Sequence, residues 1–255
     1  MGTPDFAVGS LKQLLDASFN VVGVVTAPDR PAGRGRKLQE SAVKQFAVKH
    51  QLKVLQPTNL KDEAFLEELK NLDANLQVVV AFRMLPKLVW QMPARGTFNL
   101  HASLLPQYRG AAPINWAIIN GETETGVTTF FIDEKIDTGN IILQKTAKIL
   151  PDDNAGDLHD RLMELGAHLV VDTCKQIEEK TVSLKKQDES VELKPAPKIH
   201  KDTCRIDWNS SMTNIYNHIR GLSPYPGAWT ELVNDGKHEP MKIFKTEMET
   251  SEHDY

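Results

Sequence analysis

The hydrophobic pattern of this chain alternates between two periods. Short apolar runs of strand length, several of them rich in β-branched residues, are typical of buried parallel strands; they lie at residues 19–28, 76–82, 96–103 and 126–133. Between them, apolar residues recur at every third or fourth position, which indicates amphipathic helices; these stretches are residues 4–15, 40–51, 62–72 and 152–180. Helices that alternate with buried strands predict a doubly wound, Rossmann-like α/β fold with a mostly parallel sheet.

The first helix begins almost at the start of the chain. Thr3 suits the N-cap and Pro4 the first helical position, so we expect the helix to begin at Pro4. A Gly-Thr-Pro turn that opens a helix usually follows a strand, yet only Met1 precedes it here. We therefore expect the sheet to lack a strand before Gly2.

The pattern changes after the long helix that starts at residue 152. Residues 180–198 are polar and contain prolines without helical periodicity, which indicates a linker. A short helix over residues 210–222 and strands over 228–233 and 241–249 follow. These segments predict a small β-barrel-like unit that the chain is too short to close. The predicted organisation is an α/β domain at residues 1–179, a linker at 180–198 and an incomplete C-terminal unit at 199–255.

Composition excludes several classes of protein. The 255 residues are 40% hydrophobic and 25% charged with a net charge of -4, which argues against disordered and fibrous proteins. Mild acidity argues against a surface that is basic throughout, although a local basic patch is compatible with it. Cys174 and Cys204 lie far apart and outside any Cys/His cluster, so we expect neither a disulfide framework nor a metal site. We also expect the protein to lie in the reducing cytoplasm. No apolar run has the length of a membrane span.

Candidate catalytic residues lie in the strand predicted at residues 96–103. Side chains two positions apart on a strand share a face, so Asn99 and His101 point the same way. A polar pair at the end of a buried strand is unfavourable unless it is paired or used. In open α/β sheets, ligands bind outside the carboxyl ends of the strands, where this pair lies. The next strand runs into a loop that carries Asp133 and Asp137.

An Asn, a His and a carboxylate together suit acyl transfer to an amine. The Asn amide and a protonated His can each donate to a developing oxyanion. A nearby Asp favours the charged imidazole and fixes its orientation. The spacing alone is equally compatible with a hydrogen-bonded histidine at a strand end that has no catalytic role.

Longer motifs resolve this ambiguity. Residues 99–144, NLHASLLPQYRGAAPINWAIINGETETGVTTFFIDEKIDTGNIILQ, strongly resemble the formyltransferases that use 10-formyltetrahydrofolate. MGTPDFAV, TAPDRPAGRGRKL and RGAAPIN narrow the resemblance to members that act on aminoacylated initiator tRNA. The resemblance implies Asn99, His101 and Asp137 as the catalytic set. The amine of methionine on its tRNA would attack the formyl carbon, with Asn99 and His101 holding the oxyanion and Asp137 supporting His101.

The resemblance also implies residues that bind the folate. The Ser-Leu-Leu-Pro segment after the catalytic strand matches the folate-contacting segment of the family; it comprises Ser103, Leu104, Leu105 and Pro106. The turn after residues 76–82, with Arg83 and Leu85, is a candidate for hydrogen bonds to the pterin, and Asp133 is placed at the same site. A plain passage from strand to turn accounts for residues 83–85 nearly as well.

A basic stretch interrupted by proline and glycine follows the first strand. Its charges are Arg30, Arg34, Arg36 and Lys37. Such a stretch is compatible with a solvated loop and with a mobile loop that binds RNA phosphates. The resemblance favours the second interpretation, because it implies that this insertion reaches toward the acceptor end of initiator tRNA. We expect a monomer that binds this tRNA and the folate, and no membrane.

Three alternative functions share these features. A relative that formylates a sugar-linked amine, or one that hydrolyses 10-formyltetrahydrofolate, would use the same three catalytic residues. The basic insertion and the C-terminal unit argue against both. A non-catalytic RNA-binding relative would not need Asn99, His101 and Asp137 together, and all three are present.

Overall fold

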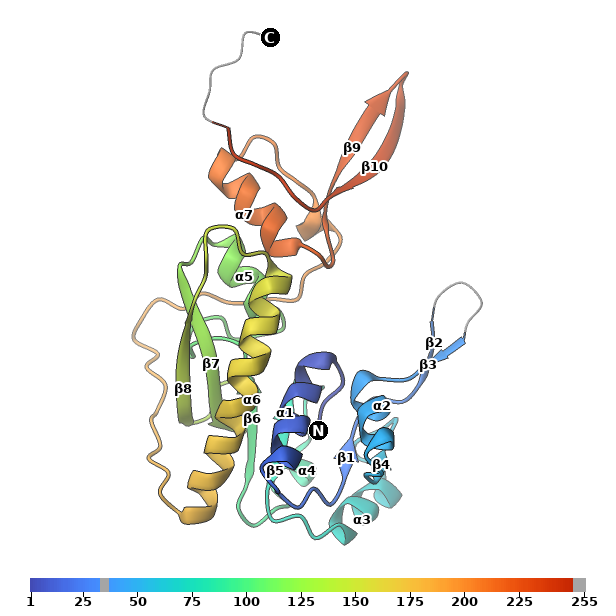
Figure 1. The fold of residues 1–255 in the computed structure, drawn as a ribbon, viewed down its shortest axis with the longest axis vertical. Helices are drawn as coiled ribbons and strands as arrows, with labels where there is room; N and C mark the ends of the chain where they lie inside the picture. Colours follow the sequence, from blue (N-terminus) through green and yellow to red (C-terminus); the bar gives the residue numbers. More distant parts are fainter. Residues whose placement is uncertain (33–36, 250–255) are drawn as a thin grey trace.

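The computed structural model describes residues 1–32 and 37–249, and Figure 1 shows their arrangement. The larger domain contains two sets of strands. β1 (Val24–Val25) pairs in parallel with β4 (Val54–Leu55). The second set is a four-stranded sheet in the order β5 (Gln77–Val80), β6 (Thr97–His101), β7 (Glu124–Phe131), β8 (Ile141–Lys148).

The predicted α/β class is confirmed, with one difference in strand direction. β5 and β6 are parallel, as are β1 and β4, whereas β7 is antiparallel to both β6 and β8. Six helices pack with these strands; they are α1 (Asp5–Asp16), α2 (Ala42–Lys49), α3 (Glu63–Asn71), α4 (Lys87–Trp90), α5 (Pro113–Ile119) and α6 (Ala155–Glu179).

The start of α1 differs from the prediction. Pro4 is the N-cap, with an extended backbone, and no side chain caps the helix. The prediction that Thr3 caps it is therefore wrong. Asp5 in the first turn interacts favourably with the positive end of the helix dipole.

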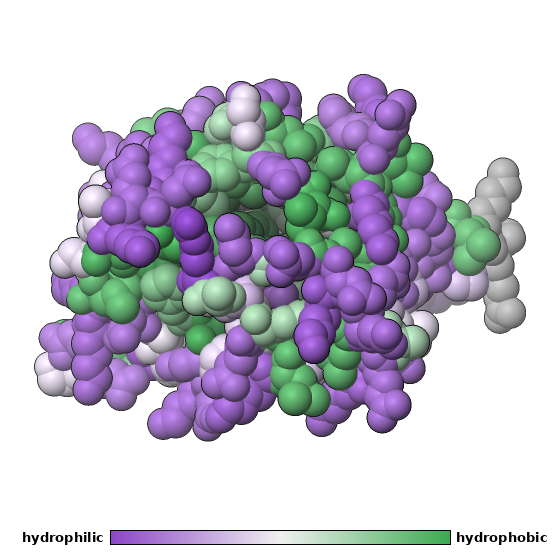
Figure 2. Space-filling model, turned by 90° about the horizontal axis from the view of Figure 1, so that it is seen from below, coloured by the Kyte–Doolittle hydropathy of each residue, from purple (hydrophilic) through white to green (hydrophobic). Residues whose placement is uncertain are grey.

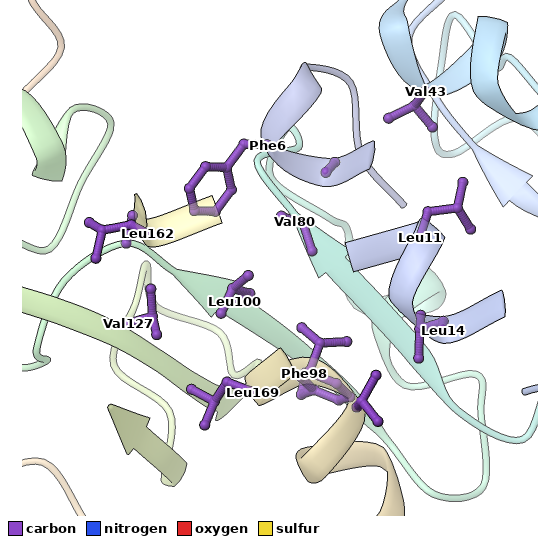
Figure 3. Packing of buried hydrophobic residues seen from close by; sticks show 14 of the residues in the cluster. Phe6, Leu11, Leu14, Val43, Val80, Phe98, Leu100, Val127, Leu162 and Leu169 are labelled. Carbon is purple, nitrogen blue, oxygen red and sulfur yellow. The ribbon is translucent and has the colours of Figure 1, made fainter. Parts of the chain in front are cut away.

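The hydrophobic core determines which face of β6 carries the polar residues. Phe98 and Leu100 lie on one face of the strand and point toward Leu162 and Leu169 of α6, as Figure 3 shows. Gly166 allows α6 to approach closely, because a Cβ there would lie 2.8 Å from a methyl carbon of Leu100. Since side chains alternate along a strand, this packing directs Asn99 and His101 to the opposite face.

Gly2 occupies the gap between β1 and β5. Its amide donates to the carbonyl of Val25 (3.0 Å), and it forms a parallel bridge with Val80. A Cβ on Gly2 would lie 2.7 Å from the Val80 carbonyl oxygen, so this approach requires glycine. The Met1 ammonium donates to the carbonyl of Val78 (2.6 Å), and burial lowers its pKa to about 5.

A cavity of about 340 Å³ adjoins this gap. It is lined mainly by apolar residues of α1, β1, β5 and the loops that precede these two strands. Figure 2 shows a hollow with hydrophobic walls near the middle of the face that is seen from below.

The C-terminal unit combines short helices with a hairpin. Its elements are the 3-10 helix η1 (Asp202–Cys204), α7 (Met212–Leu222), β9 (Ala228–Asn234) and β10 (Lys237–Ile243). The predicted strand over residues 241–249 is present with different bounds, because β10 begins at Lys237 and ends at Ile243. Asp235 and Gly236 have φ values of 50° and 74°, which make a two-residue hairpin turn, so β10 begins directly after them. Residues 199–249 contain no closed barrel.

The C-terminal unit docks against α5 and the start of α6. Asn115 of α5 donates to the carbonyl of Gly221 (2.7 Å), and Arg220 donates to the carbonyl of Asp153 (2.8 Å). The Gly156 amide also donates to the carbonyl of Ser223 (3.2 Å). These bonds hold residues 220–223 against the larger domain.

The predicted linker is bound along the larger domain rather than free of it. Lys185 pairs with Ile141 through two backbone hydrogen bonds of 2.8 and 3.0 Å. The Ala196 amide donates to the carbonyl of Arg109 (2.8 Å). The segment therefore extends the β8 edge and then reaches the loop that follows β6.

Two hairpins project from the body on the same side in Figure 1. One is β9–β10. The other is β2 (Arg30–Ala32) with β3 (Lys37–Gln39), which are antiparallel arms within the predicted basic loop. None of the helices in the described residues is long and apolar enough to cross a membrane.

Candidate active site

A cleft of about 1460 Å³ opens over the polar face of β6. Asn99 and His101 line it, together with residues 81–87 after β5 and 132–137 after β7. Tyr225 lines it from the C-terminal unit. The volume exceeds the roughly 300–1,000 Å³ of a pocket for one small molecule, so the cleft has room for parts of two substrates.

His101 has a fixed orientation in this cleft. The residue is buried, and its Nε2 lies 2.8 Å from the carbonyl oxygen of Tyr108. A carbonyl oxygen only accepts, so Nε2 carries a proton. Nδ1 faces the Asp137 carboxylate at 3.9 Å from Oδ2, which is longer than a hydrogen bond but within reach of an ion pair. A proton on Nδ1 therefore completes an imidazolium–carboxylate pair.

Tyr108, which sequence reasoning did not single out, fixes this histidine. It is buried with φ of 59°, and its amide donates to the carbonyl of Lys194 (2.7 Å). Its hydroxyl donates to the Glu122 carboxylate, and burial, followed by the Glu122 interactions, raises the pKa of that hydroxyl. The backbone at Tyr108 is thereby held so that its carbonyl meets Nε2 of His101.

Asp137 reaches His101 by a route that the sequence did not predict. Because β7 is antiparallel to β6, its last residue, Phe131, pairs with Phe98 rather than with His101. The loop 132–137 turns back along the cleft to bring Asp137 to the histidine. The backbone of Asp137 is left-handed (φ 55°), and its Oδ2 accepts from the Gly110 amide at 3.0 Å.

The amide oxygen of Asn99 has no partner among the described residues. Its Oδ1 is buried and makes no hydrogen bond with any of the described residues. Buried polar groups are nearly always paired, so each exception requires an explanation. Because Asn99 lines the cleft beside His101, a ligand bound there would supply the missing hydrogen bond.

Some of the residues predicted to bind folate line the cleft. Arg83, Leu85 and Asp133 do so. The Arg83 guanidinium donates to the carbonyls of Thr58 (2.9 Å) and Pro57. Burial and, second, the nearby Arg30 charge lower the pKa of Arg83. These contacts hold the turn after β5 at the cleft wall.

The structure does not bring the Ser-Leu-Leu-Pro segment into the cleft lining. The Leu105 amide donates to Thr128 Oγ1 (3.2 Å), and that hydroxyl donates to the Ser103 carbonyl (2.6 Å). Ser103 and Leu105 are buried, with Leu104 and Pro106 partly buried. These bonds give the segment a structural role, and its contact with folate stays a prediction.

The predicted tRNA-binding residues are only partly described. Arg34 and Arg36 lie outside the described residues. Arg30 is exposed at the start of β2, where it pairs with Gln39 of β3, and Lys37 begins β3. The Arg30 charge acts on Arg83, which lines the cleft.

The described residues offer no obvious metal ligands. Within residues 1–32 and 37–249, no group of three His, Cys, Asp or Glu side chains is placed to hold a metal ion. Cys174 and Cys204 are buried and free, and burial raises the pKa of the Cys174 thiol to about 12. A thiol with this pKa is a poor nucleophile at neutral pH.

Comparisons with known proteins agree with the geometry. The formyl transferase family matches residues 1–174, and the formyl transferase C-terminal domain family matches residues 198–255. The methionyl-tRNA formyltransferase of Parabacteroides distasonis is 59% identical over 261 residues, which cover 100% of this chain and 81% of the relative.

Solved structures of sugar formyltransferases share the fold. A sugar 3N-formyl transferase solved with dTDP and 5-N-formyl-THF has a TM-score of 0.69 and 24% identity, covering 98% of this chain and 85% of that one. An N-formyltransferase from Helicobacter canadensis, in complex with folinic acid and dTDP-3-aminofucose, has a TM-score of 0.63 and 26% identity, covering 91% and 87%.

Proposed function

The chain belongs to the formyl transferase family, and from this premise we propose that it transfers the formyl group of 10-formyltetrahydrofolate to the free amino group of methionyl-tRNA. The observation that carries the proposal is the convergence in one cleft of Asn99, whose buried Oδ1 has no partner among the described residues, with the His101–Asp137 pair. The identity to a methionyl-tRNA formyltransferase, 59% over the whole chain, supports this acceptor over the amino sugars of the more distant structures.

The proposed mechanism is direct attack by the amine. The methionine nitrogen forms a bond to the formyl carbon, and the carbonyl electron pair moves to oxygen. The Asn99 amide and the Nδ1 proton of His101, whose other proton is held by Tyr108, stabilise this oxyanion. Asp137 balances the imidazolium and removes the amine proton through water. The oxyanion pair then re-forms the carbonyl, the carbon–nitrogen bond to the folate breaks, and the proton taken by Asp137 passes to the leaving nitrogen as tetrahydrofolate departs.

A direct assay tests the proposal. The protein is mixed with 10-formyltetrahydrofolate and methionylated initiator tRNA, and formyl-methionine is measured after the ester is hydrolysed. We expect formyl-methionine in proportion to enzyme and time. The proposal fails if the folded protein consumes the folate without forming this product, or if it consumes none.

The basic stretch at residues 30–37 should govern tRNA binding and not folate binding. We expect the double substitution Arg34→Ala and Arg36→Ala to raise KM for methionyl-tRNA and to flatten its salt dependence by about 0.7 to 0.9 in log–log slope for each lost phosphate contact. The measurement is KM for each substrate across a salt series. A matched control neutralises Lys70 and Lys175, two exposed lysines that do not line the cleft. Weaker folate binding with unchanged tRNA binding would instead place the basic stretch at the folate site.

Tyr225 links the C-terminal unit to the acceptor end of the tRNA. It is 82% exposed, lines the cleft, and follows Ser223, which is anchored to Gly156. An exposed aromatic ring can stack on a base, an interaction worth about 1–3 kcal/mol. We therefore expect Tyr225→Ala to raise KM for methionyl-tRNA by about tenfold.

Two further variants serve as controls for Tyr225→Ala. Tyr225→Phe should keep KM near the wild-type value, because it keeps the ring. Trp208→Ala removes another exposed aromatic side chain of the same unit that does not line the cleft, and it should leave KM unchanged. An equal KM in wild type and Tyr225→Ala would remove Tyr225 from tRNA recognition.

A further inference from the structure

We propose that Gln187, a residue of the linker, is a positioning residue that holds Asp137 in register with His101. The inference deepens the proposed function and rests on it for the role of Asp137. Gln187 is polar, lies in a segment without sequence periodicity, and is nevertheless 5% exposed. A buried amide of this kind needs partners on both of its ends.

The amide nitrogen of Gln187 binds the backbone on both sides of Thr138. Its Nε2 donates to the carbonyl of Asp137 (2.9 Å) and to the carbonyl of Gly139 (2.9 Å). Both protons of the amide are therefore used within the loop that follows β7. The linker thus supplies hydrogen bonds that fix the backbone of the proposed catalytic carboxylate.

Arg109 fixes the orientation of the Gln187 amide. Its Nε and Nη2 donate to Gln187 Oε1 at 3.1 and 2.8 Å, and its Nη1 pairs with Glu189 at 3.1 Å. Because the guanidinium has no acceptor, the carbonyl end of the amide must face Arg109 and the NH₂ end must face the loop. The charged donor also polarises the amide and strengthens the bonds that it donates.

The loop needs this support because its backbone is unusual. Asp137 has a left-handed φ of 55°, a conformation that non-glycine residues adopt at some energetic cost. A Cβ on Gly139 would lie within 1.7 Å of the Phe131 carbonyl oxygen, so the loop closes tightly onto the end of β7. Gly110 fixes the side chain of Asp137, and Gln187 fixes its backbone.

Gln187 is not needed to dock the linker. Lys185 and Ala196 form backbone hydrogen bonds with the larger domain on either side of it. Gln107 makes a second side-chain connection, donating to the carbonyl of Glu192 (2.9 Å) and accepting from the Lys194 amide (2.8 Å). Gln107 therefore ties the linker to the domain without touching the Asp137 loop, which makes it a matched control.

The test compares Gln187→Met with Gln107→Met. Methionine keeps the approximate length of the side chain and removes its hydrogen bonds. We expect Gln187→Met to lower kcat by about tenfold or more, since small misplacements of a catalytic group have such effects, with both KM values within about twofold of wild type. Gln107→Met removes side-chain hydrogen bonds only and leaves the backbone bond from Tyr108 to Lys194, so it should leave kcat unchanged. Gln187→Glu should resemble Gln187→Met, because an ionised carboxylate cannot donate to two carbonyls.

Two further measurements separate positioning from general destabilisation. In an Asp137→Asn background, Gln187→Met should lower kcat little further, because both changes act on the same group. Without substrates, the amide signals of Asp137 and Gly139 in a ¹H–¹⁵N NMR spectrum should move in Gln187→Met and stay in place in Gln107→Met. This spectrum reports on Gln187 even if the protein forms no formyl-methionine.

Three outcomes would overturn the proposal. They are a wild-type kcat in folded Gln187→Met, an equal loss of kcat in Gln107→Met, and an undiminished effect of Gln187→Met in the Asp137→Asn background.

Discussion

Replacing His101 with alanine should lower kcat by about 10²-fold or more, which is the scale of losing one oxyanion donor. Only Nδ1 of this imidazole is free to donate to substrate, since the Nε2 proton is held by the carbonyl of Tyr108. The substitution also leaves that carbonyl and the Asp137 carboxylate without their partner. His101→Gln, which keeps a donor of similar reach, is therefore measured alongside it.

Asn99→Ala should lower kcat by a similar factor. Its buried Oδ1 has no partner among the described residues, so the side chain contributes little to the stability of the fold. The loss should appear in kcat while the melting temperature stays close to that of wild type. His50→Ala, which removes an exposed histidine of another surface, serves as the control. Near-normal turnover in folded Asn99→Ala or His101→Ala would reject the assignment of the oxyanion site.

Asp137→Asn should retain the fold and the folate affinity and lose rate, by about 10²-fold or more if the carboxylate both balances the imidazolium and accepts the amine proton. An asparagine keeps the shape of the side chain and can still accept from the Gly110 amide through its oxygen. It cannot supply the negative charge that faces Nδ1 of His101 at 3.9 Å.

The pH–rate profile distinguishes this role from simple packing. Because Asp137→Asn removes both the charge beside His101 and the proposed acceptor of the amine proton, the shape of the pH–rate profile should differ from that of wild type. Binding of a folate analogue, measured separately, should change by less than about twofold if only the chemical step is affected. A mutant with the wild-type profile and wild-type kcat would exclude Asp137 from the mechanism.

The sequence predicts the site because β structure has a strict period of two. Phe98 and Leu100 are apolar, so they must face the core, and Asn99 and His101 then share the other face. The same reasoning cannot predict the direction of a strand, because parallel and antiparallel strands can have the same apolar pattern. The antiparallel course of β7, and hence the loop that returns Asp137 to His101, emerges only in the structure.

Two other differences between the sequence-based predictions and the structure have distinct physical causes. The start of β10 was recoverable from sequence, since Asp235 and Gly236 form a typical two-residue hairpin turn. Gln187 and Tyr108 were not, because their roles depend on contacts with residues distant in sequence. Gln187 binds a carbonyl 50 positions away, and Tyr108 binds Lys194 through backbone atoms that any residue possesses.

The measurement that tests the central claim most directly is a competition among formyl acceptors. The protein receives 10-formyltetrahydrofolate labelled in the formyl group, together with methionylated initiator tRNA and a nucleotide-linked amino sugar in water. The label should appear in formyl-methionyl-tRNA, with little in formate or formylated sugar, and the transfer should fall in His101→Ala. Label that enters formate or the sugar as fast as the tRNA, or that transfers equally well in His101→Ala, would contradict the account.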